Sequence, residues 1–435
     1  MMERDGMQAL VAWRNKPKRK PLILRGARQV GKTWLMKEFG RLYFRHTVYV
    51  NFENAVELKS LFLQNLDVHR ILQTLQIYAG ITIDPANTLI IFDEIQSVEK
   101  GITSLKYFCE EAPEYAIIAA GSLLGMGLHA QHSFPVGKVE FLDLRPLCFY
   151  EFLNACGKKH WAEALKQRQW QVAEPFHAAF TDMLRIYFYV GGMPEAVQTY
   201  IDTKDFSEVR AVQQNIIQAY QADFSKHAPY EIVPRIQMVW NSIPAQLAKE
   251  NKKFIYGVIR EGSRAKDFEL AIMWLVECGL LLKTHRVSKP AIPLAAYQDL
   301  SVFKLFLVDV GLLSALSRLD SKTLIEGNAV FTEFKGAQTE QFVMQELVAA
   351  RHDYMGYWTN EKSTAEVDFI VQKAGVVFPL EVKAETNVRA KSFRLFCEKF
   401  RPALAYRASL LPFREESWMT NIPLYGVWSR EYLIP

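Results

Sequence analysis

The N-terminal third of the chain alternates short, almost wholly apolar runs with longer segments of mixed character. Runs at Leu22–Leu24, Leu89–Phe92 and 115–120 have the length and uniform hydrophobicity of strands buried on both faces. A helical pattern follows the first of these runs. Strands that alternate with helices predict a parallel sheet covered by helices. We therefore expect a parallel-sheet α/β domain over residues 1–165.

Helical periodicity replaces this pattern after about residue 160. The segments "FHAAFTDMLRIYFYVGGMPEAVQTYI" and "EVRAVQQNIIQAYQADF" carry apolar residues at spacings of three and four. Gly191-Gly192-Met193-Pro194 interrupts the first segment, as Gly and Pro do in helices. The pattern predicts a helical domain over residues 166–235. We interpret it as a lid, and ordinary core helices are the alternative.

Residues 236–320 show the order of elements found in a winged helix. "SRAKDFELAIMWLVECGLLLKTHRV" gives a polar start, an amphipathic helix and a strand. "AAYQDLSVFKLFLVDVGLLSAL" then gives a second strand and a closing helix. The polar stretch 317–336 reads as a linker.

The last hundred residues return to an α/β pattern. "GAQTEQFVMQELVAARH" predicts a helix, and "STAEVDFIVQKAGVVFPLEVKAE" predicts two strands joined by a turn at Ala374-Gly375. We expect an α/β domain over residues 330–435. The apolar face of its helix would carry four residues: Val343, Met344, Leu347 and Val348.

Composition and charge exclude only a few classes of protein. The chain has 435 residues and a formal charge of +5, which permits a nucleic-acid partner without requiring one. The 5 cysteines are scattered without a Cys-x-x-Cys pair, which suits a reducing compartment and argues against structural zinc. No stretch approaches the roughly 18 uninterrupted apolar residues of a membrane span. We expect a soluble, cytoplasmic protein.

The strongest chemical signal follows the first apolar run. "KPLILRGARQVGKTWLMKEFG" places Gly-x-x-x-x-Gly-Lys-Thr between a strand and a helix, which is the setting of a phosphate-binding P-loop. The backbone would wrap around the phosphates of ATP, Lys32 would reach the β- and γ-phosphates, and Thr33 would bind Mg²⁺. The expected nucleotide-binding residues are Gly26, Ala27, Arg28, Gln29, Val30, Gly31, Lys32 and Thr33.

Two acidic residues end the second apolar run. Parallel sheets bind ligands at the carboxyl ends of their strands, where Asp93 and Glu94 would lie. Asp93 would hold Mg²⁺ through water, and Glu94 would polarise the water that attacks the γ-phosphate. Ser122 ends the third run and is a candidate sensor of the γ-phosphate.

These residues resemble the AAA-type ATPases. One subgroup shows segments similar to "VNFEN", "IIFDEIQ", "AAGSLLG", "LRPLCFYEFL" and "YVGGMPEAV" in this order, ahead of a domain of unknown function. The resemblance implies a homo-oligomer in which a neighbour's arginine completes each ATP site. Relatives often have Gly-Arg where this chain has Gly137-Lys138, so the residue that completes a neighbour's site would be Arg145 or Lys138 here.

The C-terminal strands carry clustered charge. With Ala374-Gly375 as the turn, Asp368 would face Glu381 across the hairpin, and Lys383 would lie on the same face. Glu340 falls in the middle of the apolar helix face, and Glu346 at its edge. Opposed carboxylates repel, and Lys383 offsets one of three negative charges, so we expect Asp368, Glu381 and Glu340 to bind Mg²⁺ or Mn²⁺.

This pattern resembles the PD-(D/E)XK nuclease superfamily over roughly residues 333–400. The resemblance implies metal-dependent cleavage of DNA, with Glu340, Asp368, Glu381 and Lys383 as catalytic residues.

The winged-helix segment has basic flanks that suit phosphate contacts with DNA. We therefore expect an ATPase that acts on DNA. The alternatives are a nucleotide-driven switch or scaffold with an inactive C-terminal domain that binds a protein, and a peptide remodeller. The basic residues are Arg260, Arg264, Lys266, Lys283, Arg286 and Lys289.

Overall fold

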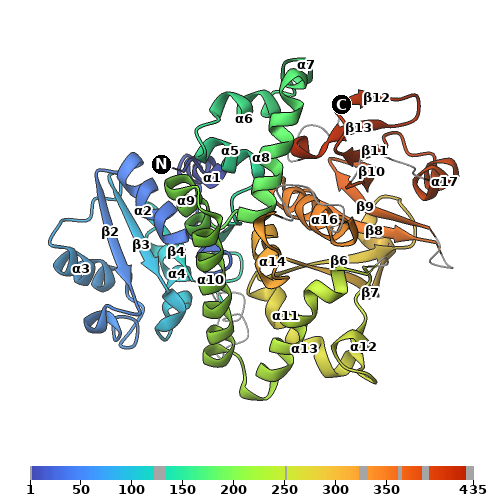
Figure 1. The fold of residues 1–435 in the computed structure, drawn as a ribbon. Coiled ribbons are helices and arrows are strands. Elements are labelled where there is room, and N and C mark those ends of the chain that lie inside the picture. Colours follow the sequence, from blue (N-terminus) through green and yellow to red (C-terminus); the bar gives the residue numbers. More distant parts are fainter. Residues whose placement is uncertain are drawn as a thin grey trace. The chain divides into compact units, whose positions relative to one another are not determined.

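The computed structural model describes residues 2–121, 134–249, 252–322, 332–360, 365–384 and 391–427 (Figure 1). The chain divides into two compact units. One consists of Glu3–Arg145 with Glu277–Gly279, and the other contains Pro146–Val276 and Leu280–Pro435. Each unit has its own sheet.

The N-terminal unit is built on a parallel five-stranded sheet with the order β2-β3-β4-β1-β5. β3 and β4 are buried along their whole length, which explains their continuous apolar sequences. The strands are β1 (Leu22–Arg25), β2 (His46–Asn51), β3 (Thr88–Asp93), β4 (Ala116–Ala120) and β5 (Glu140–Asp143). The longer helices are α1 (Asp5–Arg14), α2 (Lys32–Tyr43), α3 (Val68–Ala79) and α4 (Gly101–Glu111). The predicted parallel sheet is confirmed.

The second unit begins with helices. Its predicted helical segment is confirmed as helical, and α8 ends at Val190 where Gly191-Gly192 follows. Within this unit α8 and α10 both pack against α14. The lid role stays a prediction. The helices are α5 (Phe149–Ala155), α6 (Lys159–Lys166), α7 (Trp170–Ala173), α8 (His177–Val190), α9 (Pro194–Thr203), α10 (Phe206–His227), α11 (Val233–Leu247), α12 (Tyr256–Ile259), α13 (Ala265–Glu277), α14 (Val310–Leu316), α16 (Thr332–Ala349) and α17 (Lys391–Phe400).

The sheet of this unit has eight strands in the order β12-β13-β11-β10-β9-β8-β6-β7. Figure 1 shows this sheet with α16 on one side of it. The strands are β6 (Leu281–Val287), β7 (Gln298–Leu307), β8 (Tyr354–Thr359), β9 (Glu366–Lys373), β10 (Val376–Val382), β11 (Tyr406–Ser409), β12 (Arg414–Glu415) and β13 (Thr420–Pro423).

The two strands expected in the winged-helix segment belong to this sheet. β6 and β7 form the antiparallel hairpin, as predicted, but β6 also pairs in parallel with β8 through His285–Gly356 and Arg286–Tyr357. Backbone hydrogen bonds thus join the segment 236–320 to the segment 330–435. The winged-helix domain over residues 236–320 stays a prediction. The pairing of β6 with β8 was not predicted, because pairing between distant strands leaves no trace in local sequence.

A buried polar network connects the helices of this unit to one another. Asp309, the N-cap of α14, accepts a hydrogen bond from the Gly192 N–H at 2.6 Å. Gly192 in turn accepts one from the Leu147 N–H at 2.7 Å, and Gln345 donates to Tyr187 at 2.8 Å. A Cβ on Gly192 would lie 2.0 Å from the Leu147 carbonyl oxygen, so only glycine fits there. The "GGMP" segment is therefore a close backbone contact as well as a helix break.

Helix α16 is more completely buried than its sequence predicts. It packs against α14, β7 and β10, so almost every side of it is covered. Val343, Met344 and Leu347 are buried as expected, but Val348 is only partly buried. Glu346, expected at the edge of the apolar face, is fully buried and accepts a hydrogen bond from the Phe149 N–H at 3.0 Å. Burial raises the pKa of Glu346 well above its usual value.

Candidate functional sites

The P-loop has the backbone of a phosphate-binding turn. It leaves β1 at Arg25 and enters α2 at Lys32. Gly31 has a φ of 93° and Gly26 a φ of 147°, conformations that favour glycine. A Cβ on Gly26 would also lie 2.2 Å from the Leu144 carbonyl oxygen. The two glycines of the motif are thus fixed by backbone geometry.

Lys32 lies inside this loop. Its side chain is buried, and its ammonium donates to the carbonyl oxygens of Gly26 and Ala27, both at 2.8 Å. Burial lowers the pKa of Lys32 to about 8, against the opposing pull of Glu94 and Asp93. The ammonium is held where phosphate oxygens can replace the carbonyls as acceptors.

Asp93 closes the site at the end of β3. Its Oδ2 accepts hydrogen bonds from Thr33 Oγ1 at 2.7 Å and from the Tyr49 hydroxyl at 3.0 Å. The structure thus brings together Thr33 and Asp93, which lie 60 residues apart and are the pair expected to bind Mg²⁺. The hydroxyl and carboxylate oxygens are suitable ligands for that ion.

Tyr49 was not predicted as a site residue. It lies on β2, whose register pairs Asn51 with Asp93 and so aligns the polar ends of the two strands. Burial and the Asp93 charge raise the pKa of Tyr49 to about 12, so it remains a hydrogen-bond donor. The "YVNFEN" sequence shows a polar residue inside a strand, but it does not reveal the partner.

Glu94 follows Asp93 in a left-handed conformation with a φ of 51°. Its Oε2 accepts a hydrogen bond from Gln96 Nε2. A non-glycine residue in this region of conformational space is uncommon and is often found at functional sites.

Two further candidates of this unit, Arg145 and Lys138, each lie beside an acidic side chain. Arg145 lies beside Asp143 at 4.0 Å, and burial lowers the pKa of its guanidinium. Lys138 forms an ion pair with Glu110 at 2.9 Å. Ser122 lies outside the described residues.

Arg4 was missed by the sequence reasoning. Its guanidinium donates to the carbonyl oxygens of Val30 at 3.1 Å and Arg145 at 2.6 Å. It therefore connects the P-loop to the end of β5. Its position near the start of the chain gives no local signal of this role.

The C-terminal hairpin has the predicted register. Val376 pairs with Lys373, which leaves Ala374 and Gly375 as the turn, and both have the positive φ values of a type I′ turn. The ladder ends at the Leu380–Phe369 pair, and one further step of the same register would set Glu381 opposite Asp368.

The charges around Asp368 and Glu381 pair among themselves. Asp368 Oδ2 accepts a hydrogen bond from the Val382 N–H at 2.7 Å, and Lys383 Nζ lies 2.6 Å from Glu381 Oε1. Burial, together with the charges of Glu340 and Glu381, raises the pKa of Asp368 well above its usual value. Asp368 is also hydrogen-bonded to Glu340. The carboxylates thus share protons and lysines.

Two lysines that lie outside the predicted nuclease domain add positive charge to the carboxylate cluster. Lys252 and Lys304 both form ion pairs with Glu340, and Lys304, fully buried on β7, also pairs with Glu366. Burial raises the pKa of Glu340, but the two lysines outweigh it and the pKa falls below its usual value. The expectation that Lys383 is the sole compensating cation is therefore wrong.

The predicted metal ligands do not form a metal site in this arrangement. Within the described ranges, no group of three or more His, Cys, Asp or Glu side chains is placed to hold a metal ion. The lysines meet the carboxylates instead. Glu340, Asp368, Glu381 and Lys383 do lie together as predicted, but as one charged cluster with Lys252, Lys304 and Glu366.

Three family models match separate stretches of the chain. Residues 18–153 match an AAA domain, residues 181–323 a domain of unknown function (DUF8612), and residues 335–425 a second domain of unknown function (DUF4143). The N-terminal unit has the fold of an AAA-type P-loop ATPase. The order of the matches agrees with the predicted ATPase followed by a domain of unknown function. None of the matched families is described as a nuclease.

Solved structures resemble the chain at low identity. The Walker-type ATPase paby2304 of Pyrococcus abyssi is 16% identical, over 73% of this chain and 96% of its own, with a TM-score of 0.46. ORC1 of Aeropyrum pernix, solved in complex with DNA, is 14% identical over 72% and 90%, with a TM-score of 0.27. PCH-2 of C. elegans is 10% identical over 63% and 66%, with a TM-score of 0.24. No curated protein matches the chain. The ATPase fold therefore rests on the family match and the P-loop geometry.

The basic residues expected to contact DNA divide into two groups. Arg286 pairs with Asp299 at 2.6 Å, and Lys283 lies 4.2 Å from the centre of the Phe303 ring, so both are engaged within the fold. Arg260, Arg264, Lys266 and Lys289 are exposed. The outer face of α13 also exposes Leu270 and Met273, so it is not uniformly basic.

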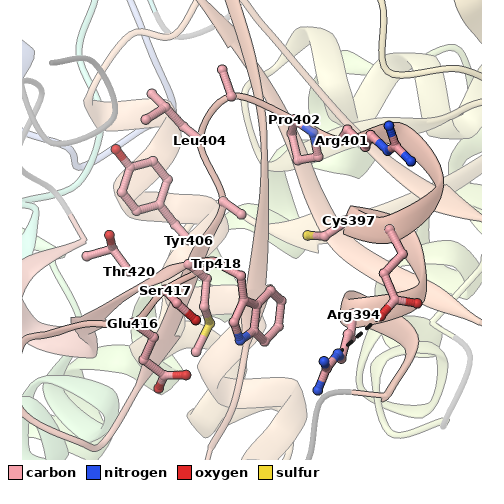
Figure 2. A pocket seen from close by; sticks show the side chains of 14 residues that line it. Arg394, Cys397, Arg401, Pro402, Leu404, Tyr406, Glu416, Ser417, Trp418 and Thr420 are labelled. Carbon is pink, nitrogen blue, oxygen red and sulfur yellow. Dashed lines mark hydrogen bonds and ion pairs between the residues drawn. The ribbon is translucent and has the colours of Figure 1, made fainter.

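A cavity of about 580 Å³ lies in the part matched by DUF4143, between α17, the start of β11 and the segment before β13 (Figure 2). Cys397, Tyr406 and Trp418 line it, and the Arg394–Glu398 ion pair at 3.2 Å lies at its edge. Its volume is that of a small-molecule site. None of the charged-cluster residues lines it. No sequence pattern indicated this cavity.

None of the helices in the described residues is both long and apolar enough to cross a membrane.

Proposed function

We propose that the N-terminal unit binds ATP with Mg²⁺ and hydrolyses it. Lys32 contacts the β- and γ-phosphates, Thr33 and Asp93 hold Mg²⁺, and Glu94 orients the attacking water. The proposal rests on one observation above all, the placement of the Lys32 ammonium inside the loop with the Thr33–Asp93 pair at its mouth. When bound, Mg²⁺ neutralises charge on the phosphates.

Two substitutions test this assignment. Lys32→Ala removes the charge that meets the phosphates, so we expect nucleotide binding to be lost. Glu94→Gln keeps the shape of the site but cannot polarise water, so ATP should bind and remain unhydrolysed, with kcat reduced at least about a hundredfold. Fluorescent-nucleotide titration and phosphate release measure the two effects. Hydrolysis by Lys32→Ala at the wild-type rate would show that the assignment is wrong.

The second unit acts on DNA in this proposal. Four exposed basic residues, Arg260, Arg264, Lys266 and Lys289, supply phosphate contacts. A nuclease-like role is the second candidate function, because Asp368, Glu381 and Lys383 lie together. The described residues show no group placed to hold the metal ion that this chemistry would need. The rival is a nucleotide-driven scaffold whose C-terminal part binds a protein.

Plasmid DNA distinguishes these functions. We expect binding to weaken steeply with salt and to weaken further when Arg264 and Lys266 are changed to Glu. With Mn²⁺ the protein should nick the plasmid, and Lys383→Ala should stop the nicking while binding is retained. Binding without nicking favours a DNA-dependent ATPase with an inactive cluster. If neither occurs, the scaffold function is favoured.

A further inference from the structure

The Glu94 carboxylate is held by only one of its two oxygens. Its Oε2 accepts a hydrogen bond from Gln96 Nε2, and no other hydrogen bond reaches this carboxylate within the described residues. The side chain is partly exposed, and its negative charge acts on Lys32 inside the P-loop. Oε1 is therefore left open near the phosphate-binding loop. A general base needs such an oxygen, because it must accept the proton of the attacking water.

Gln96 lies in a short turn whose backbone is fixed on both sides. A 3₁₀ turn follows Glu94, and the Ser97 N–H donates to the Glu94 carbonyl oxygen at 2.9 Å. Ile95 and Val98 are buried in the apolar core of the N-terminal unit. The backbone at Gln96 is thus anchored, and its side chain reaches back over two residues to Glu94.

The Gln96 amide has no second hydrogen bond to orient it. Its Oε1 is buried and has no hydrogen-bond partner among the described residues. Buried polar groups are almost always paired, so each exception calls for an explanation. The fold gains nothing from this unpaired oxygen, since an apolar side chain of similar size would bury no polar atom. In the part of the chain that the structure describes, the hydrogen bond to Glu94 is therefore the interaction that requires an amide at this position.

We propose that Gln96 is a positioning residue for ATP hydrolysis. Its amide fixes Glu94 Oε2, so that Oε1 stays free to take the proton of the attacking water. The inference rests on the proposed ATPase function and adds to it a residue that belongs neither to the P-loop nor to the Asp93–Glu94 pair. In the sequence, Gln96 is the last residue of the segment "IIFDEIQ".

Steady-state ATP hydrolysis by the full chain tests this role. Gln96→Leu keeps the size of the side chain but cannot donate a hydrogen bond. Its kcat should fall at least about tenfold, because the freed carboxylate leaves its reacting position for much of the time. KM and the Kd of ATP should stay within about twofold of the wild-type values, since Lys32 and the loop backbone are untouched. Ser97→Ala, at the exposed position next to Gln96, is the matched control and should hydrolyse ATP at the wild-type rate.

A double variant separates positioning from a structural effect. Glu94→Gln combined with Gln96→Leu should hydrolyse ATP as slowly as Glu94→Gln alone, because Gln96 acts only through the Glu94 carboxylate. A further fall in the double variant, or a loss of ATP binding in Gln96→Leu, would show a structural role and overturn the proposal. If Gln96→Leu does not fold, Gln96→Met takes its place and the same expectations apply.

A wild-type kcat in Gln96→Leu would also overturn the proposal. With Glu94→Gln slow in the same assay, that result refutes the role of Gln96 and leaves the ATPase assignment intact. Wild-type hydrolysis by Glu94→Gln refutes instead the proposed role of Glu94, and the role of Gln96 fails with it.

Discussion

At the scale of single residues, the proposed ATP site includes side chains that lie outside its sequence motifs. Asp93 Oδ2 accepts from both Thr33 and Tyr49, so the tyrosine fixes the orientation of the carboxylate expected to hold Mg²⁺. Lys37 Nζ lies 3.8 Å from the centre of the Tyr49 ring and helps to fix the tyrosine. Groups that orient a metal ligand often matter almost as much as the ligand itself.

Tyr49→Phe should therefore raise the Mg²⁺ concentration needed for half-maximal hydrolysis by about tenfold, because Asp93 loses one of its two hydroxyl donors. Binding of ATP without Mg²⁺ should be unchanged, since Lys32 and the loop backbone are untouched. Phosphate release at varied Mg²⁺ measures the first effect, and nucleotide titration in EDTA measures the second. An unaltered Mg²⁺ requirement would show that the hydrogen bond has no positioning role.

At the scale of elements, the contact between the α8–α9 break and the start of α14 depends on one buried carboxylate. Asp309 accepts hydrogen bonds from the Gly192 N–H and from the first turn of α14. Burial raises its pKa from 3.8 to about 6 in spite of these bonds. A raised folded-state pKa means that the ionised form is disfavoured by folding. Stability from this group is thus highest at low pH and falls as pH rises from about 4 to about 6.

Asp309→Ala leaves buried N–H groups without acceptors and should lower the free energy of unfolding by about 3 kcal/mol. The wild-type protein gains further stability when Asp309 is protonated, whereas the variant cannot. The loss should therefore be larger at pH 5 than at pH 7.5. Urea unfolding at both pH values measures it. A loss that is the same at both values would show that Asp309 does not titrate in this range.

At the scale of the whole molecule, the expected oligomer would place Arg145 in a neighbour's ATP site. Light scattering with a non-hydrolysable ATP analogue should show assembly. Arg145→Ala and Glu94→Gln should each be inactive alone, but mixing them should restore hydrolysis, because Glu94→Gln subunits supply Arg145 to sites with an intact Glu94. A monomer at every concentration, or no recovery on mixing, would contradict action between subunits.

The sequence predicted those features that depend on residues close together along the chain. The P-loop required glycines at fixed positions between a strand and a helix, and Gly26 and Gly31 adopt the conformations that explain them. The C-terminal hairpin took its register from Ala374-Gly375, because a two-residue turn fixes which residues face each other. The sequence by itself therefore determined the ATPase core and the position of Asp368 opposite Glu381.

Contacts between distant segments were decided only by the tertiary structure. β6 and β8 are about 70 residues apart and pair through the unsatisfied backbone groups of their edges. The sequence of a strand does not indicate which other strand it will pair with. Lys252 and Lys304 are ordinary basic residues until folding brings them to Glu340. The charge balance of the cluster, and with it the question of whether a metal can enter, is a property of that three-dimensional assembly. An ionised carboxylate buried in this cluster is stable only when a cation pairs with it, and the fold determines which cation lies close enough to do so.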